Sequence, residues 1–104
     1  MREYCAEVKG PTVELLGALF DLQTDASQGQ RVVELVDTLL RAEAIRPSAE
    51  GAAQLAWDRH ARATLGEIRD AAQAGDGVRA WVAFSAQGSG LHLLGKACQG
   101  QPGW

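Results

Sequence analysis

The chain has 104 residues, of which 46% are apolar and 22% are charged, and its net charge is −3 at neutral pH. This length predicts a single domain, residues 1–104, and the apolar content excludes a disordered chain. A net negative charge provides no long-range attraction for nucleic acid or for anionic membrane surfaces, so we expect neither as a partner.

Residues 2–8 alternate weakly between apolar and polar side chains, which predicts a short N-terminal strand or a disordered lead-in. Gly10 and Pro11 then begin a first helix, because proline fits the first helical position and has no N–H to leave unpaired. The periodicity fades at residues 23–25, where we expect this helix to end. Its apolar stripe holds Val13, Leu16, Leu19 and Phe20, and Leu15 and Leu22 widen it.

A second helix is predicted between Ser27 and Pro47. Ser27 and Gln30 match a capping box, and the residue before a proline is pushed out of the helical region. This segment has the strongest amphipathic pattern in the chain. Its apolar side carries Val32, Leu35, Val36, Leu39, Leu40 and Ile45. Its outer side carries Glu34, Asp37, Arg41 and Glu43.

A third helix follows a cap at Ser48 and runs to about Ala74, where Gly75 suits a left-handed terminator. One face of this helix is lined by Ala53, Trp57, Ala61, Leu65, Ile68 and Ala72. The shared helical periodicity of the three segments predicts one core. We expect this core to join Leu16, Leu19, Phe20, Val32, Val36, Leu39, Trp57, Leu65 and Ile68.

The spacing of apolar residues changes at residues 75–77, after which apolar residues alternate with polar ones or follow one another continuously. This change predicts two strands, 78–85 and 91–97, joined by a hairpin loop at 86–90. The tail, residues 98–104, is rich in glycine and glutamine and is expected to fray. We therefore predict an α+β fold, a three-helix block followed by a C-terminal β-hairpin, with the short N-terminal strand as an optional addition.

Both faces of the predicted hairpin are apolar, whereas the three helices can cover only one of them. The uncovered face carries Trp81, Ala83, Leu91 and Leu93. Exposed apolar surface beside an unpaired strand edge usually marks an interface. The excess of arginine over lysine, with abundant alanine and glycine, is typical of GC-rich bacterial genomes. We therefore predict a non-enzymatic bacterial interaction protein that forms a homodimer, or binds a larger protein partner, through this face.

Two other functions stay open. A pocket between the helices and the hairpin, lined by Trp57, His60, Phe84 and His92, would bind a small ligand. Three helices followed by a hairpin is also the element order of a winged-helix module, and this resemblance implies DNA binding. However, acids balance bases on the outer face of the third helix, and the loop at 86–90 has no positive charge to contact phosphate.

No catalytic, cofactor or metal site is predicted. The segment 90–97 matches the phosphate-loop pattern G-x-x-x-x-G-K, but Ala97 stands where a hydroxyl must hold Mg²⁺, and too few residues follow for a helix. His60, His92 and Cys98 show no recurring ligand spacing, so a structural zinc site is not expected.

Cys5 and Cys98 lie near the two ends of the sequence and belong to no C-x-x-C motif. The first residues carry an acid and lack the apolar stretch of a signal peptide, and the longest uncharged stretch is too short and too polar to span a bilayer. We therefore expect a cytoplasmic protein with two reduced, buried thiols. A disulfide between the two cysteines is the alternative if both lie on neighbouring strands.

Overall fold

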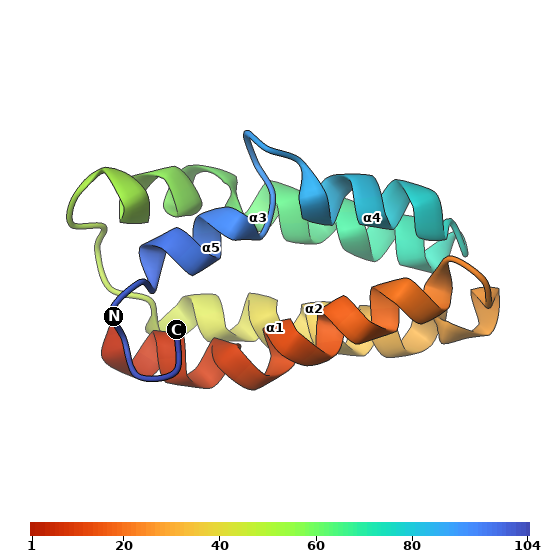
Figure 1. Ribbon diagram of the computed structural model, residues 1–104, viewed down its shortest axis with the longest axis horizontal. Coiled ribbons are helices and arrows are strands. Elements are labelled where there is room, and N and C mark those ends of the chain that lie inside the picture. The colour runs from red at the N-terminus through yellow and green to blue at the C-terminus, as the bar shows by residue number, and fades with distance from the viewer.

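The computed structural model describes residues 1–104 and consists of helices and their connections, with no strand (Figure 1). The five α-helices are α1 (Arg2–Leu22), α2 (Gly29–Ala42), α3 (Ala52–Gln73), α4 (Gly77–Ser85) and α5 (His92–Ala97). Two single-turn 3-10 helices, η1 (Ala26–Gln28) and η2 (Glu43–Ile45), flank α2. None of the helices combines the length and the apolar character that crossing a membrane requires.

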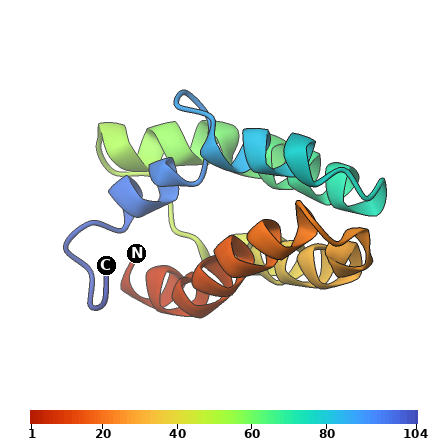
Figure 2. The ribbon, with the colours of Figure 1, turned by 45° about the vertical axis from the view of Figure 1, so that its right-hand side comes forward.

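The helices form an up-down-up-down bundle in which α4 and α5 together take the place of a fourth helix. Helices α1 and α2 make one antiparallel layer, and α3 makes the second layer with α4 and α5, which return along it (Figures 1 and 2). Short connections between antiparallel neighbours are the usual way to build such a bundle. Both chain ends therefore lie at the same end of the molecule, as the two views show.

One core of buried apolar side chains runs between the two layers. The predicted core residues of α2 and α3 are buried, as is Leu19, and this part of the prediction is confirmed. Leu16 and Phe20 are 38% and 56% exposed, so the prediction was wrong for them. The reason is that α1 turns a different stripe inward, at the spacing of a helix face. That stripe consists of Tyr4, Cys5, Val8, Leu15, Ala18, Leu19 and Leu22.

The predicted α+β fold is wrong, because residues 78–85 and 91–97 form helices rather than a hairpin. The carboxylate of Asp76 caps α4 by accepting the backbone N–H of Arg79 at 3.0 Å. Gly77 begins the helix where a Cβ atom would lie 2.6 Å from the carbonyl oxygen of Leu22, so the end of α1 fixes the start of α4. A continuous run of apolar residues is compatible with a strand as well as with a helix. Here the cap by Asp76 and the close approach of Gly77 to Leu22 favour the helix.

A tight connection separates α4 from α5. The N–H of Leu91 donates to the carbonyl of Phe84 at 2.9 Å, and the N–H of Gly90 donates to that of Ala86 at 2.7 Å. A Cβ atom on Gly90 would lie 2.5 Å from both carbonyl oxygens, so a glycine is required at this point. The glycines predicted to make a hairpin loop therefore turn the chain between two helices.

The prediction for the N-terminal end of the chain was also wrong. Residues 2–8 belong to α1, which passes through Pro11 without ending, so no N-terminal strand forms. The residues after α5, expected to fray, turn back over α1, and the indole N–H of Trp104 donates to the carbonyl of Cys5 at 2.9 Å. These contacts hold the C-terminal segment against the first turns of the chain.

Candidate functional site

A group of exposed and half-buried apolar side chains lies where α1 meets α4. Phe20 of α1 contacts Trp81 of α4, with ring centroids 5.0 Å apart, and Trp81 stacks on Phe84 at 5.6 Å. Val13 and Leu16 continue the stripe from Phe20 along α1, at helical spacing. We call these five residues, Val13, Leu16, Phe20, Trp81 and Phe84, the apolar seam.

The apolar seam is open to solvent along α1. Val13 is 66% exposed, and Leu16 and Phe20 are exposed as well, whereas Trp81 and Phe84 are half-buried. Helix α1 packs much more extensively on α2 than on α4. Contiguous exposed aromatic and aliphatic side chains of this kind are uncommon on a monomer that has no partner.

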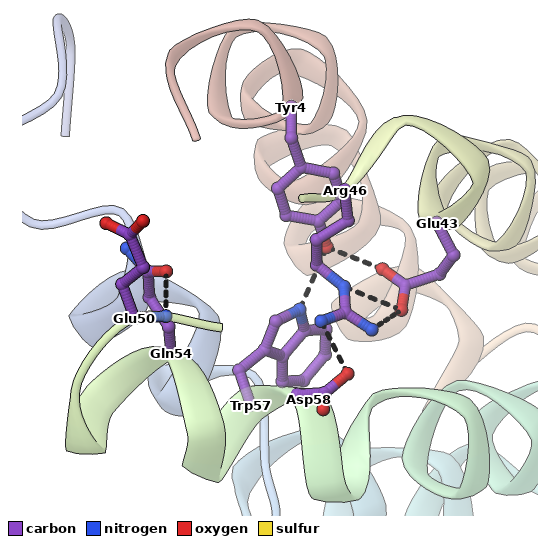
Figure 3. Close-up of polar contacts among 7 residues, drawn as sticks. All are labelled: Tyr4, Glu43, Arg46, Glu50, Gln54, Trp57 and Asp58. Atoms are coloured by element: carbon purple, nitrogen blue, oxygen red, sulfur yellow. Dashed lines mark hydrogen bonds and ion pairs between the residues drawn. The ribbon is translucent and has the colours of Figure 1, made fainter. Parts of the chain in front are cut away.

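A buried polar network joins α1, η2 and α3 (Figure 3). The Tyr4 hydroxyl donates to Glu43 Oε2 at 2.8 Å and accepts the indole N–H of Trp57 at 2.8 Å. Arg46 donates to Glu43 Oε1 from Nε at 3.0 Å and from Nη2 at 2.8 Å. Its Nη1 pairs with Asp58 Oδ1 at 2.6 Å. The network therefore links three parts of the chain that are distant in sequence.

The environment of this network raises the pKa of two of its groups, Tyr4 and Arg46. Burial raises the pKa of the Tyr4 hydroxyl far above its ordinary value. The hydrogen bond from the Trp57 indole lowers this pKa, Glu43 raises it, and the charge of Arg46 lowers it, but burial is the largest cause. Burial lowers the pKa of Arg46, but its hydrogen bonds to Glu43 and Asp58 outweigh this, and its pKa is raised overall. Since each polar group faces a partner inside the protein, the network acts as a structural clamp.

Glu43 had been placed on the outer side of the second helix, and this was wrong. Its side chain is 1% exposed, because α2 ends at Ala42 and the 3-10 turn that follows directs it toward α1. Near this network, at the start of α3, Gln54 Oε1 accepts a hydrogen bond from the backbone N–H of Glu50 at 2.9 Å (Figure 3).

A pocket of about 400 Å³ opens between α3 and α4. At one side Arg79 donates to the two carboxylate oxygens of Glu67, from Nε at 3.0 Å and from Nη2 at 2.5 Å. At another the Thr64 hydroxyl donates to the carbonyl of Ser89 at 2.6 Å. The lining residues are His60, Ala63, Thr64, Glu67, Arg79, Val82, Ala83, Ala86 and Ser89.

The four predicted interface residues do not share one surface. Trp81 lies in the apolar seam, and Ala83 faces the pocket between α3 and α4. Leu91 is buried in the core, and Leu93 is half-buried against it. The uncovered hairpin face on which this set was based does not exist.

The four predicted pocket residues also lie apart. His60 lines the pocket between α3 and α4, whereas Trp57 is buried in the core beside Tyr4. Phe84 belongs to the apolar seam, and His92 is exposed on α5. Glu67 and Thr64, two other polar residues of the pocket, were not singled out in the sequence. Their partners Arg79 and Ser89 are too distant along the chain for any local motif.

Cys5 and Cys98 form a disulfide, so the expectation of two reduced thiols was wrong. The bond joins the start of α1 to the residue after α5, and both cysteines are fully buried. Their pairing needs no strands, because the bundle itself brings the two chain ends together. No group of three or more histidine, cysteine, aspartate and glutamate side chains is arranged to hold a metal ion.

Comparisons with models of protein families, with curated proteins and with solved structures found no match to this chain.

Proposed function

We propose that the protein is a non-enzymatic interaction module that pairs with a second copy of itself through the apolar seam. The observation that carries this proposal is the exposure of Val13, Leu16 and Phe20 beside the half-buried rings of Trp81 and Phe84. Covering a leucine or phenylalanine side chain contributes about 1.5–3 kcal/mol each. The seam takes the place of the hairpin face that the sequence suggested.

The spacing along α1 suits an antiparallel pair about a twofold axis, the commonest symmetry of protein dimers. An axis between Leu16 and Gly17 sets Val13 opposite the partner's Phe20, and Leu16 opposite the partner's Gly17. The space around Gly17 is open, so a large side chain fits against it. Each bulky seam residue of α1 then meets a complementary position on the other copy.

Charges at the two ends of the stripe support the same arrangement. Lys9 forms no ion pair within the chain, and the antiparallel pairing brings it beside the partner's Thr24 and Asp25. Hydrogen bonds from the Ser27 side chain and backbone, and from Gln28, lower the pKa of Asp25, so its carboxylate is ionised at neutral pH. A cation at one end and an anion at the other favour the antiparallel orientation over the parallel one.

Sedimentation equilibrium tests the proposal. We expect a dimeric wild type and a monomeric Leu16→Glu variant, because a carboxylate on the axis would face the partner's apolar surface. Leu55→Glu is the matched control, since Leu55 is 48% exposed on α3, outside the seam. A monomeric wild type would refute the dimer. A dimer that survives Leu16→Glu and dissociates with Leu55→Glu would place the interface on α3.

The disulfide bears on the compartment in which the module works. Disulfides persist in oxidising environments and are rare in the cytoplasm. We therefore propose an oxidising compartment in place of the cytoplasmic location expected from the sequence, because Cys5 and Cys98 are joined. Thiol labelling in denaturant of the protein taken from its own cells, without reductant, tests this, because both cysteines are buried in the folded chain. Two labelled cysteines would contradict it.

A further inference from the structure

The pocket between α3 and α4 has no part in the proposed dimer, because none of its lining residues belongs to the apolar seam. Its volume of about 400 Å³ lies within the range of small-molecule sites. We propose that it binds an uncharged, largely apolar small molecule that carries one hydrogen-bonding head group. This site is a second function, independent of self-association.

The walls of the pocket are preformed. The hydrogen bond from Thr64 to the carbonyl of Ser89 ties α3 to the connection after α4, and the Arg79–Glu67 pair ties the other end of α4 to α3. The backbone bond from Gly90 to Ala86 fixes the connection itself. A ligand therefore finds these walls already in place, which reduces the entropy lost on binding.

The α3 wall of the pocket runs from His60 to Glu67, with Ala63 and Thr64 between them. His60 and Glu67 are seven residues apart on α3, which places them about 10 Å apart along the helix axis. The methyl groups of Ala63 and Ala83 line the space between, and Val82, which is 60% exposed, stands at the rim. A ligand of this length with an apolar body would cover that exposed valine.

The ion pair between Arg79 and Glu67 disfavours ligands with a charged head group. The hydrogen bond from Arg79 lowers the pKa of Glu67, so both partners are ionised and their charges cancel. A carboxylate approaching Arg79 would be repelled by Glu67, and an ammonium group approaching Glu67 would be repelled by Arg79. Arg79 still has the two N–H groups of Nη1 to donate, because only Nε and Nη2 bind Glu67. A neutral acceptor such as an amide carbonyl fits this arrangement.

Three probes of equal chain length and different charge test the class of ligand: octanamide, octanoate and octylamine. Titrations followed by two-dimensional amide NMR report both the affinity and the location of binding. With wild type we expect octanamide to bind about tenfold more tightly than either charged probe, with shifts at Ala63 and Ala83. Tighter binding of octanoate or octylamine, no binding of octanamide, or shifts confined to the apolar seam would overturn the proposal.

Variants of the ion pair make the test sharper. Glu67→Gln leaves the cation of Arg79 unbalanced, so the preference should move to octanoate. Arg79→Gln leaves the carboxylate of Glu67 unbalanced, so the preference should move to octylamine. Ala63→Phe, at an exposed lining position, should abolish binding, whereas Ala53→Phe at an exposed position of α3 outside the pocket should leave it unchanged. A ligand preference that ignores both ion-pair variants would contradict the assigned role of this pair.

Discussion

Removing the disulfide should remove a large part of the stability of the bundle. Cys5 and Cys98 are separated by 93 positions, so the cross-link closes nearly the whole chain into a loop. In the chain-entropy model, a loop of this length restricts the unfolded state by about 4.6 kcal/mol at room temperature. A domain of this size is stable by about 5–15 kcal/mol in total. We therefore expect the variant Cys5→Ala/Cys98→Ala to be marginally folded.

Urea unfolding of three samples measures this effect: oxidised wild type, the double variant, and wild type reduced in denaturant and refolded with dithiothreitol. Reduction must be done on the unfolded chain, because both cysteines are fully buried in the folded one. The reduced wild type should resemble the variant. Both should show a steeper dependence on urea than the oxidised protein, because their unfolded chains expose more surface. A stability difference below about 1 kcal/mol between the oxidised protein and the variant would refute the reasoning.

Three further predictions concern single residues. Because burial raises the pKa of Tyr4, the stability that it contributes is complete below its ordinary value near 10 and is lost as the pH rises above it. Tyr4→Phe should flatten that alkaline loss, and tyrosinate absorbance of the chain's single tyrosine reports the raised pKa directly. Thr12→Val should raise stability by up to about 1 kcal/mol, because Thr12 Oγ1 is buried without a hydrogen-bond partner. A lower melting temperature would show that the hydroxyl has a partner. Gly90→Ala should lower the free energy of unfolding by about 1–3 kcal/mol, whereas Gly88→Ala, with open space around it, should change it little. Equal effects of these two glycine variants would contradict the packing at Gly90.

The middle of the chain was the part that sequence patterns described well. The second helix has a regular apolar stripe, with Pro47 soon after it, and the third is followed by Gly75, which has a φ of 70°. Such features depend only on residues close together in sequence, so they start or end a helix independently of the rest of the chain. The helices of the middle were therefore predicted, although their ends differ by a few residues.

The two ends of the chain required tertiary information. The run from Val78 to Phe84 is apolar at nearly every position, so its period does not distinguish a strand from a helix. What distinguishes them is the contact of Gly77 with Leu22, residues far apart in sequence. In the same way, residues 2–8 alternate like a weak strand, yet Tyr4, Cys5 and Val8 form one buried helical stripe.

The polar sites were beyond sequence reasoning for the same reason. Tyr4 meets Glu43 across 39 positions and Trp57 across 53, and no local spacing reports such distances. Glu43 looks like an ordinary outer residue in the periodicity of its helix, and only the turn after Ala42 brings it inside. The pair of Glu67 and Arg79 likewise lies on two helices. Among the pocket residues, His60 was found because it sits at the edge of an apolar face.

The distribution of these contacts along α1 favours association through the apolar seam. The first turns of α1 are fixed by the disulfide at Cys5, by the polar network at Tyr4, and by Trp104, all at the end of the bundle that holds both termini. The rest of the helix carries the exposed stripe and ends against α4. A helix anchored at both ends presents its apolar face without further ordering, and preorganisation of this kind lowers the entropy lost when two copies meet. The clamp at one end of α1 would therefore lower the entropic cost of the association that we propose for the seam along its length.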